Sequence, residues 1–144
     1  MAVVVVRLSA ENTTLLNRIA DDVFDGPIDQ QQLAAFVTDP RHLMMLAVED
    51  DTVIGMASGV EYFHPDKPPQ MWINEVGVAS AHRRRGIGRA LTASLVQEAK
   101  TRGCVYAWLG TDQDNAAGQA CFGSVPGVDS PRPFLLFEWD FESQ

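Results

Sequence analysis

The chain has 144 residues, of which 46% are apolar and 21% are charged, and its formal net charge is −8 at pH 7. This length and composition predict one domain, residues 1–144, with a substantial core, and the negative charge argues against nucleic acid as a partner because phosphate contacts need a basic surface. No apolar run is long enough for a membrane span or a signal-peptide core, so we expect a cytoplasmic protein whose two cysteines stay thiols.

The first forty residues predict one strand and two helices. Residues 2–8 predict a strand, in which four consecutive valines suggest burial on both faces. From Leu15 to Val23 the apolar residues recur at helical spacing, and residues 25–28, which include a glycine and a proline, break that helix near Phe24. Asp29 is placed to cap a second short helix.

The next thirty residues predict a β-hairpin followed by a loop. Residues 43–49 and 52–61 have the composition of strands, and the short connection between them is typical of a tight hairpin turn. Residues 63–69 contain three prolines and therefore predict a loop.

The central stretch, residues 71–103, reads as a strand, a basic turn and a helix. Apolar side chains alternate over 71–79 and predict a strand, whereas residues 80–85 are polar and end in three arginines. Over 86–102 the apolar residues share one helical face, and Gly103 is placed to end the helix in a left-handed conformation.

The last forty residues predict a strand over 105–109, a short helix from Asn115 to about Phe122, an irregular segment and a terminal strand over 134–141. In this terminal strand, aromatic side chains alternate with acidic ones. The predicted order is β-α-α-β-β-β-α-β-α-β. One mixed α/β sheet with helices on both faces would bury the apolar stripes.

The basic turn suits a phosphate or pyrophosphate group. Backbone N–H groups at a helix N-terminus are free and partly positive, and glycines at 86 and 88 carry no Cβ that would hold a ligand away. A Walker loop is absent, and a dinucleotide fingerprint would need a glycine where Leu91 stands. The alternative is a capped amphipathic helix preceded by a solvated basic turn.

Arg83-Arg-Arg-Gly-Ile-Gly88 resembles the Arg/Gln-x-x-Gly-x-Gly/Ala motif of the GCN5-related N-acetyltransferases, the GNAT family, in which this motif cradles the pyrophosphate of coenzyme A. The preceding Glu75-Val-Gly-Val strand and the following helix strengthen the resemblance, and the element order is also that of the GNAT fold. The stretch 71–127 looks most similar to the small aminoglycoside 3-N-acetyltransferase branch and its uncharacterised relatives.

The resemblance implies acetyl-CoA as co-substrate, bound between the strand that ends near Ala79 and the strand over 105–109. The backbone of the first strand would pair with the pantetheine arm, the turn would hold the pyrophosphate, and a residue before the short helix would contact the cofactor arm. The implied cofactor-binding residues are Val76, Gly77, Val78, Arg83, Arg84, Arg85, Gly86, Ile87, Gly88, Arg89 and Asn115. For Asn115 the structural alternative is an N-cap of the short helix.

The reaction needs a neutral amine, so a base must remove a proton from the ammonium form. Glu75 is the leading candidate, because the family often places a carboxylate on this strand; the alternative is an ordinary strand glutamate paired with an arginine. Asp112 is the second candidate. The family's usual general acid, a tyrosine on the last short helix, is replaced by Phe122, which has no proton to give.

The implied function is transfer of an acetyl group to a primary amine of a small cationic substrate such as an aminoglycoside. The alternatives are protein N-terminal or lysine acetylation, and a catalytically weak acyl-CoA-binding or sensing module. We expect no metal site, because the histidines are not spaced as ligands. Members of the family that the chain resembles are often dimers, and here the aromatic terminal strand could supply a homodimer interface. The predicted acceptor-binding residues are Asp22, Asp25, Glu61, Tyr62 and Asp66; a solvated acidic surface is the alternative for each carboxylate.

Overall fold

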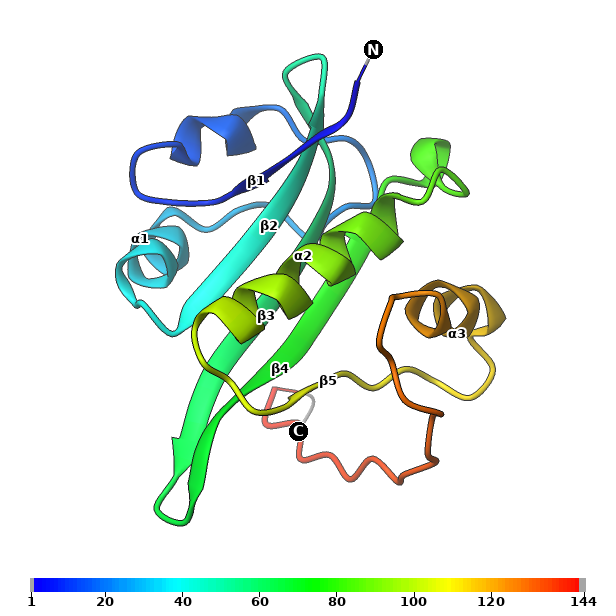
Figure 1. The fold of residues 1–144 in the computed structure, drawn as a ribbon. Coiled ribbons are helices and arrows are strands. Elements are labelled where there is room, and N and C mark those ends of the chain that lie inside the picture. Colours follow the sequence, from blue (N-terminus) through cyan, green and yellow to red (C-terminus); the bar gives the residue numbers. More distant parts are fainter. Residues whose placement is uncertain (1, 143–144) are drawn as a thin grey trace.

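The computed structural model describes residues 2–142. One five-stranded sheet runs through the molecule, with strand order β1-β2-β3-β4-β5 (Figure 1). The first four strands are antiparallel neighbours, and β5 is parallel to β4. In chain order the elements are β1 (Val4–Arg7), the 3₁₀ helix η1 (Thr13–Asn17), α1 (Gln30–Thr38), β2 (His42–Glu49), β3 (Thr52–His64), β4 (Lys67–Val78), the 3₁₀ helix η2 (Ser80–His82), α2 (Ile87–Thr101), β5 (Ala107–Trp108) and α3 (Ala116–Gly123).

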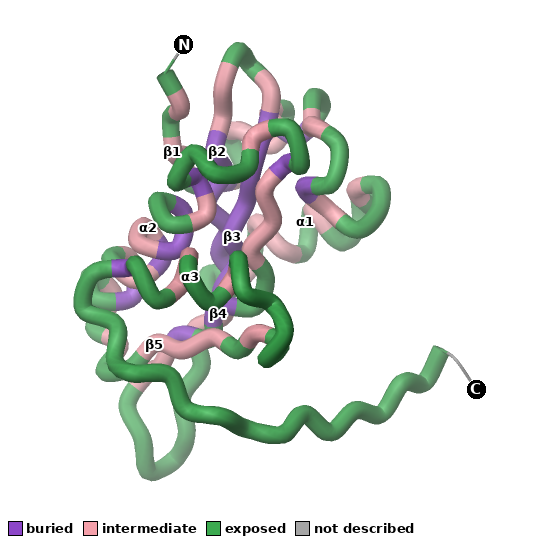
Figure 2. The backbone as a smooth tube through the Cα atoms, turned by 90° about the vertical axis from the view of Figure 1, so that its right-hand side faces the viewer, coloured by how far each residue is buried: buried purple, intermediate pink, exposed green. Residues whose placement is uncertain are grey.

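Helices cover both faces of the sheet, as predicted, and α2 and α1 lie on opposite sides of it (Figure 2). On the α2 side, Leu91 and Leu95 are fully buried against Ile54 and Met71. The other core is formed by η1, α1 and the opposite faces of β2 and β3, around Leu46. Burial of these apolar surfaces on both faces is the main source of stability.

Several predicted elements are confirmed. The Asp29 side chain caps α1 by accepting a hydrogen bond from the Gln32 backbone N–H at 2.9 Å. The β2–β3 hairpin turns through two left-handed residues, Asp50 and Asp51, with φ angles of 52° and 60°, the conformation of a type I′ turn. Gly103 follows α2 with a φ of 85°, as expected for a residue that ends a helix.

The predicted helix over residues 15–24 is wrong, because only the short η1 forms there. The chain then makes a parallel bridge between Ile19 and Val53. The Ala20 N–H donates to the Val53 carbonyl at 2.9 Å, and the Val53 N–H donates to the Arg18 carbonyl at 2.8 Å. Val53 lies beyond the end of β4, so its backbone groups need a partner, and this requirement overrides the local helical pattern.

The predicted loop over 63–69 is also wrong. Strands β3 and β4 continue into a long hairpin in which His64 pairs with Lys67. Proline is tolerated at the start of β4, where few ladder hydrogen bonds are needed, and the Pro69 carbonyl accepts a hydrogen bond from the Val105 N–H at 2.9 Å.

Both ends of the chain differ from the prediction. β1 lies at the edge of the sheet and Val4 is 54% exposed, so the valine run is not buried on both faces. β5 is confined to two residues, and the segment 134–141 forms no strand within the described part of the chain. Its apolar side chains are exposed, which leaves its alternating pattern without a partner surface.

Candidate active site

The basic turn leads directly into α2. Arg84 and Gly86 both have left-handed backbones, with φ angles of 64° and 76°, and Gly86 is the N-cap of the helix. These conformations reverse the chain between η2 and α2. The first N–H groups of α2 have no acceptor within the helix, so they are available to an anion together with the positive end of the helix dipole.

The two glycines of the motif have different roles. A Cβ on Gly86 would meet no atom within 4 Å, so this position is reserved for glycine by its positive φ. A Cβ on Gly88 would lie 3.1 Å from the Cys121 sulfur and 3.6 Å from a methyl group of Val78. Gly88 therefore allows α2 to approach α3 and the end of β4 closely.

The arginines of the turn are not equivalent. Arg85 forms a two-pronged ion pair with Glu49 in the β2–β3 hairpin and also contacts His82. The hydrogen bond from Arg85 lowers the pKa of Glu49 despite some desolvation, and the same pairing raises the pKa of Arg85. Arg83 and Arg84 are exposed and form no ion pair with the described residues, so their charges face solvent.

Arg89, in the first turn of α2, donates from Nε to the Ser124 carbonyl at 3.0 Å. This contact fixes the end of α3 beside the N-terminus of α2. Figure 1 shows α3 next to this half of α2, on the side where β5 leaves the sheet.

β4 and β5 separate after two paired positions. The parallel ladder joins Met71 to Ala107 and Trp72 to Trp108, whereas β4 continues to Val78. From Ile73 onward the β5-facing edge of β4 has no strand partner among the described residues. This backbone edge leads toward the turn and remains open to hydrogen bonds from an extended ligand.

Glu75 lies at a β-bulge in β4. Ser58 pairs with Glu75 while Gly59 pairs with Ile73, so one extra residue is inserted between these pairs. The bulge lets Ile73 and Val76 both reach the α2-side core. The Glu75 side chain is exposed and forms no ion pair with the described residues, so the alternative in which it pairs with an arginine is not observed.

Asp112 and Asn115 lie in the loop between β5 and α3. Asp112 is exposed, and its backbone carbonyl accepts a hydrogen bond from the Asn115 N–H at 3.1 Å. The Asn115 side chain caps α3 by accepting from the Gly118 N–H at 3.0 Å, and its Nδ2 donates to the Thr111 hydroxyl at 2.9 Å. The N-cap alternative is thus confirmed.

Cys121 and Phe122 lie near the end of α3. Phe122 is half-buried, and the Cys121 sulfur lies 3.1 Å from the position that a Cβ on Gly88 would take. Burial raises the pKa of the Cys121 thiol, which favours the neutral, unreactive form. Packing is therefore the role that the structure gives to Cys121.

The predicted acceptor residues do not form one cluster. The Ser80 hydroxyl donates to the carboxylate of Asp22, which has a left-handed backbone with a φ of 70°. Glu61 pairs with Arg102 at 3.0 Å. Asp66 lies at the tip of the β3–β4 hairpin, where it pairs with Lys67 and contacts His64. That tip is at the opposite end of β4 from the basic turn (Figure 1).

Tyr62 belongs to an aromatic group on the sheet that the sequence did not reveal as a unit. Its hydroxyl accepts a hydrogen bond from Trp108 Nε1 at 2.7 Å and donates to Gln70 at 2.9 Å. Trp72 and Trp108 stack with ring centroids 5.7 Å apart. The pairing of β4 with β5 brings these indoles together, and nothing in the local sequence signals it.

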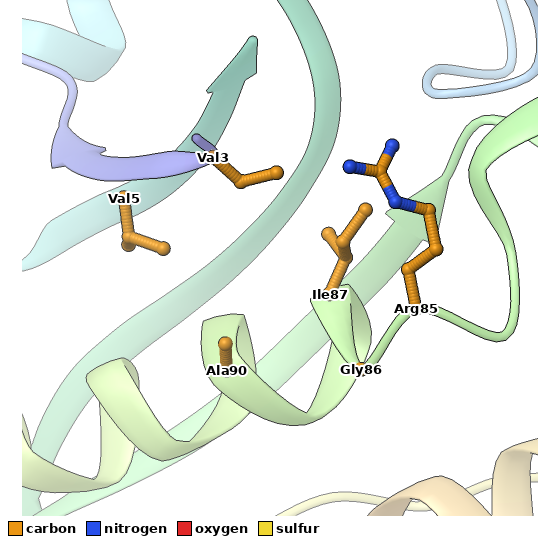
Figure 3. A pocket seen from close by; sticks show the side chains of 6 residues that line it. All are labelled: Val3, Val5, Arg85, Gly86, Ile87 and Ala90. Atoms are coloured by element: carbon orange, nitrogen blue, oxygen red, sulfur yellow. The ribbon is translucent and has the colours of Figure 1, made fainter. Parts of the chain in front are cut away.

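Two cavities flank the basic turn. One, of about 440 Å³, is lined by residues 20–22 and 79–82 and includes Asp22 and Ser80. The other, of about 140 Å³, lies between the N-terminal strand and the first turn of α2, where Val3 and Val5 face Ile87 and Ala90 (Figure 3). The larger cavity joins the turn to the segment that contains Asp22.

Within residues 2–142, no three His, Cys, Asp or Glu side chains gather closely enough to hold a metal ion. Among these same residues, none of the helices combines the length and the apolar character that crossing a membrane demands.

The fold is similar to that of solved acetyltransferases. An aminoglycoside acetyltransferase, meta-AAC0020, from an uncultured soil metagenomic sample in complex with trehalose is 14% identical, with a TM-score of 0.78 over 96% of this chain and 97% of that one. The aminoglycoside N-acetyltransferase AAC(6')-Iy in complex with CoA is 16% identical, with a TM-score of 0.71 over 95% of each chain. A ribosomal-protein-alanine N-acetyltransferase from Brucella melitensis biovar Abortus 2308 is 16% identical, with a TM-score of 0.67 over 95% of this chain and all of that one.

The search of curated proteins found no match. The model of the acetyltransferase (GNAT) family matches residues 11–124, which include β2 to β5, the basic turn and all of α3. With the sheet, the bulged β4 and the glycine turn in place, this match shows that the chain belongs to the GNAT family of N-acetyltransferases.

Proposed function

We propose that this enzyme transfers the acetyl group of acetyl-CoA to a primary amine of a small cationic substrate. The observation that carries the proposal is the turn at Gly86, where free N–H groups of α2 lie beside the unpaired edge of β4. Together they offer an anion site and a row of backbone hydrogen-bonding groups, which are the two features that a pyrophosphate and a pantetheine arm require.

The residues present fit acetyl-CoA. Backbone N–H groups from Arg84 to Arg89 would bind the pyrophosphate, with the exposed charges of Arg83 and Arg84 nearby. Each hydrogen bond to a charged oxygen contributes about 1.5–3 kcal/mol. The backbone of residues 76–78 would bind the pantetheine arm. Arg85 is already paired with Glu49, so we assign it to holding the turn in shape.

The amine substrate must lose a proton before it attacks. A primary ammonium group with a pKa near ~10 is only about 0.1% neutral at pH 7, which adds about 4 kcal/mol to the barrier. Glu75, exposed on the bulge of β4, is the proposed base, directly or through a water molecule, and Asp112 is the second candidate. The amine nitrogen then bonds to the acetyl carbon and loses its second proton to solvent, while the carbon–sulfur bond breaks and the sulfur leaves as thiolate.

The thiolate takes its proton from solvent in this scheme, because Phe122 occupies the position of the usual tyrosine. A thiolate whose conjugate acid has a pKa of ~8.5 is an adequate leaving group near neutral pH.

We retain two of the predicted carboxylates as anchors for the cationic acceptor: Asp22, which lies beside the 440 Å³ cavity, and the exposed Asp25. Glu61 and Asp66 are already paired with cations, Arg102 and Lys67, so we give these two carboxylates no primary role. The Tyr62 hydroxyl is held by Trp108 and Gln70, and it also receives no primary role. Cytoplasmic action is proposed for an enzyme with two free thiols.

Free-thiol release from acetyl-CoA, measured with aminoglycosides, polyamines, amino acids and short peptides, tests the proposal. Release with a polycationic small amine supports it. Release with peptides alone would favour protein acetylation, an alternative supported by the similarity to a ribosomal-protein-alanine N-acetyltransferase. No release, with acetyl-CoA still raising the Tm, would identify a binding module.

A further inference from the structure

Arg85 is the middle residue of three in the turn that leads into α2, and both of its neighbours have left-handed backbones. Arg84 and Gly86 have φ angles of 64° and 76°. A residue with a Cβ is strained at such an angle and keeps it only where its surroundings hold the chain in place. The Arg85 side chain leaves the turn immediately before Gly86 (Figure 3), so its contacts decide how firmly the turn is held.

Two side chains from different elements hold the Arg85 guanidinium. On the side of the β2–β3 hairpin, Nη1 donates to Glu49 Oε1 at 3.2 Å and Nη2 donates to Oε2. On the side of η2, Nη1 lies 2.7 Å from Nδ1 of the half-buried His82. Nη1 carries two hydrogens, so it can donate to Glu49 and to His82 at the same time.

The contact with Arg85 fixes the protonation state of His82. Arginine only donates hydrogen bonds, so Nδ1 of His82 must accept one, and a ring nitrogen accepts only when it carries no proton. His82 is therefore neutral, with its proton on Nε2. A protonated Nδ1 would point an N–H group at a cation and would turn toward Glu49 Oε1, which lies 3.7 Å away. His82 and Arg85 would then compete for one carboxylate.

His82 stands on a rigid base. It is the last residue of η2, and its N–H donates to the Ala79 carbonyl at 2.9 Å. Ala79 is buried, and its own N–H donates to the Ile54 carbonyl in the core at 2.9 Å. Because η2 is tied to the sheet in this way, a hydrogen bond from Arg85 to His82 ties the turn to the sheet as well.

We propose that His82 is a positioning residue of the cofactor-binding turn: its neutral form holds Arg85 in place, and its protonation loosens the turn and weakens the binding of coenzyme A. This inference deepens the proposed function and rests on it, since it concerns the site assigned to the pyrophosphate. Histidine is the side chain that ordinarily changes charge between about pH 5 and 8. The affinity for the cofactor should therefore be highest at the alkaline end of that range and fall toward the acidic end.

The other charged groups around His82 keep their charges over this range. The hydrogen bond from Arg85 lowers the pKa of Glu49, and the same bond raises the pKa of Arg85. Asp21 and Asp22 line the cavity that His82 also lines. Aspartates ordinarily stay ionised above about pH 5. A change in cofactor affinity within the range thus points to the imidazole.

Binding of dephospho-CoA, measured by calorimetry across this pH range, tests the proposal. This form of the cofactor keeps the pyrophosphate but lacks the ribose phosphate, whose own titration near pH ~6 would overlap the effect. We expect the affinity of the wild type to fall about three- to ten-fold from the alkaline to the acidic end, the loss that corresponds to one net hydrogen bond. His64, at the far tip of the β3–β4 hairpin, supplies the matched control, and His64→Asn should show the wild-type profile.

Two substitutions of His82 separate its hydrogen bond from its charge. Asparagine places an acceptor oxygen near the position of Nδ1 and does not titrate. His82→Asn should therefore keep the wild-type affinity at the alkaline end and show no loss at the acidic end. Leucine fills the space without an acceptor, so His82→Leu should bind at every pH as weakly as the wild type does at the acidic end. Circular dichroism checks that both variants are folded.

Four results would overturn the proposal. Equal wild-type affinity at both ends of the range, or wild-type affinity in His82→Leu, would mean that His82 does not hold the turn for the cofactor. Affinity that rises toward acidic pH would mean that protonated His82 attracts the pyrophosphate as a cation. A full pH response in His82→Asn would assign the effect to another group. No binding at any pH, by contrast, would overturn the proposed function itself and this inference with it.

Discussion

Gly86 has a left-handed backbone at the position where the turn becomes a helix, and a Cβ added to it would point into open space. An alanine there would cause no collision, so its effect isolates the cost of the backbone conformation.

We predict that Gly86→Ala lowers stability by about 1–2 kcal/mol, because a residue with a Cβ is strained at positive φ. For a domain of this size the Tm should fall by about 2–8 °C. Acetyl-CoA should also bind more weakly if the turn shifts. Gly123→Ala is the control, because a Cβ on Gly123 would also meet open space but its φ lies outside the positive range. Calorimetry measures the Tm of both variants. Equal Tm values for the two variants would contradict the strain argument.

Glu75 is an exposed carboxylate on a bulge, which is a geometry that aims a side chain out of the regular pleat. We predict that Glu75→Gln lowers kcat by about 100-fold or more, the usual contribution of a general base, and leaves the affinity for acetyl-CoA nearly unchanged. Steady-state kinetics and calorimetric binding measure the two effects separately. If kcat is retained, Glu75 is not the base.

Asp112 can be compared with a neighbour in the same loop. Asp112→Asn should slow turnover or raise the KM for the amine, whereas Asp114→Asn, also exposed and two residues away, should do neither. A fall in kcat alone would indicate proton transfer, and a rise in KM alone would indicate an anchor for the amine. Identical kinetics in the two variants would remove Asp112 from the site.

At the scale of elements, the Glu49–Arg85 pair ties the β2–β3 hairpin to the turn before α2. Arg85 lowers the pKa of Glu49 below its ordinary value of 4.5. A carboxyl with a lowered folded-state pKa stabilises the protein above its unfolded-state pKa, and this contribution is lost as the pH falls through the lowered value.

We therefore predict that Glu49→Gln is less stable than the wild type at pH 7, and that the difference shrinks as the pH falls below about 4.5. Arg85→Gln breaks the same pair from the other side and should show the same trend. Urea unfolding at several pH values measures the difference in free energy of unfolding. A difference that stays constant down to pH 3 would show that the pair does not stabilise the turn.

The elements that the sequence predicted well are those specified by neighbouring residues. Asp29 caps α1, two aspartates turn the β2–β3 hairpin, and Gly103 ends α2, all through local backbone geometry. The helix predicted after Leu15 failed because Val53, far along the chain, needed partners for its backbone. The terminal strand failed because alternation indicates a strand without indicating which edge receives it.

In the candidate site, too, the local features were predicted from the sequence and the long-range contacts were not. The motif from Arg83 to Gly88 located the turn and the helix N-terminus, since both depend on consecutive residues. The different roles of Gly86 and Gly88 required the packing of α3, and the pairing of Arg85 required Glu49, which lies 36 residues earlier. The acidic residues proposed for the acceptor were grouped by charge alone, and the fold places Asp66 at the far end of β4.

At the scale of the whole molecule, the net charge of −8 creates a field that attracts cations. We predict that the KM of a polycationic acceptor rises several-fold between about 20 mM and 300 mM NaCl, because salt screens this attraction, while kcat changes little. A monoamine acceptor should show a smaller slope. A flat or falling KM for the polycation would mean that the field does not help to capture the substrate.

The strands lie in the sheet in the same order as they occur in the chain, and every buried member of the two described core clusters lies at or before Ala99. A ribosome releases the chain from its N-terminus at about 5–20 residues per second. Strands β1 to β4 and α2 can therefore assemble while the last residues are still being made. The exposed apolar segment 134–141 is made after these elements, so its side chains leave the ribosome when the sheet can already have formed, which shortens the time that they spend beside unfolded parts of the same chain.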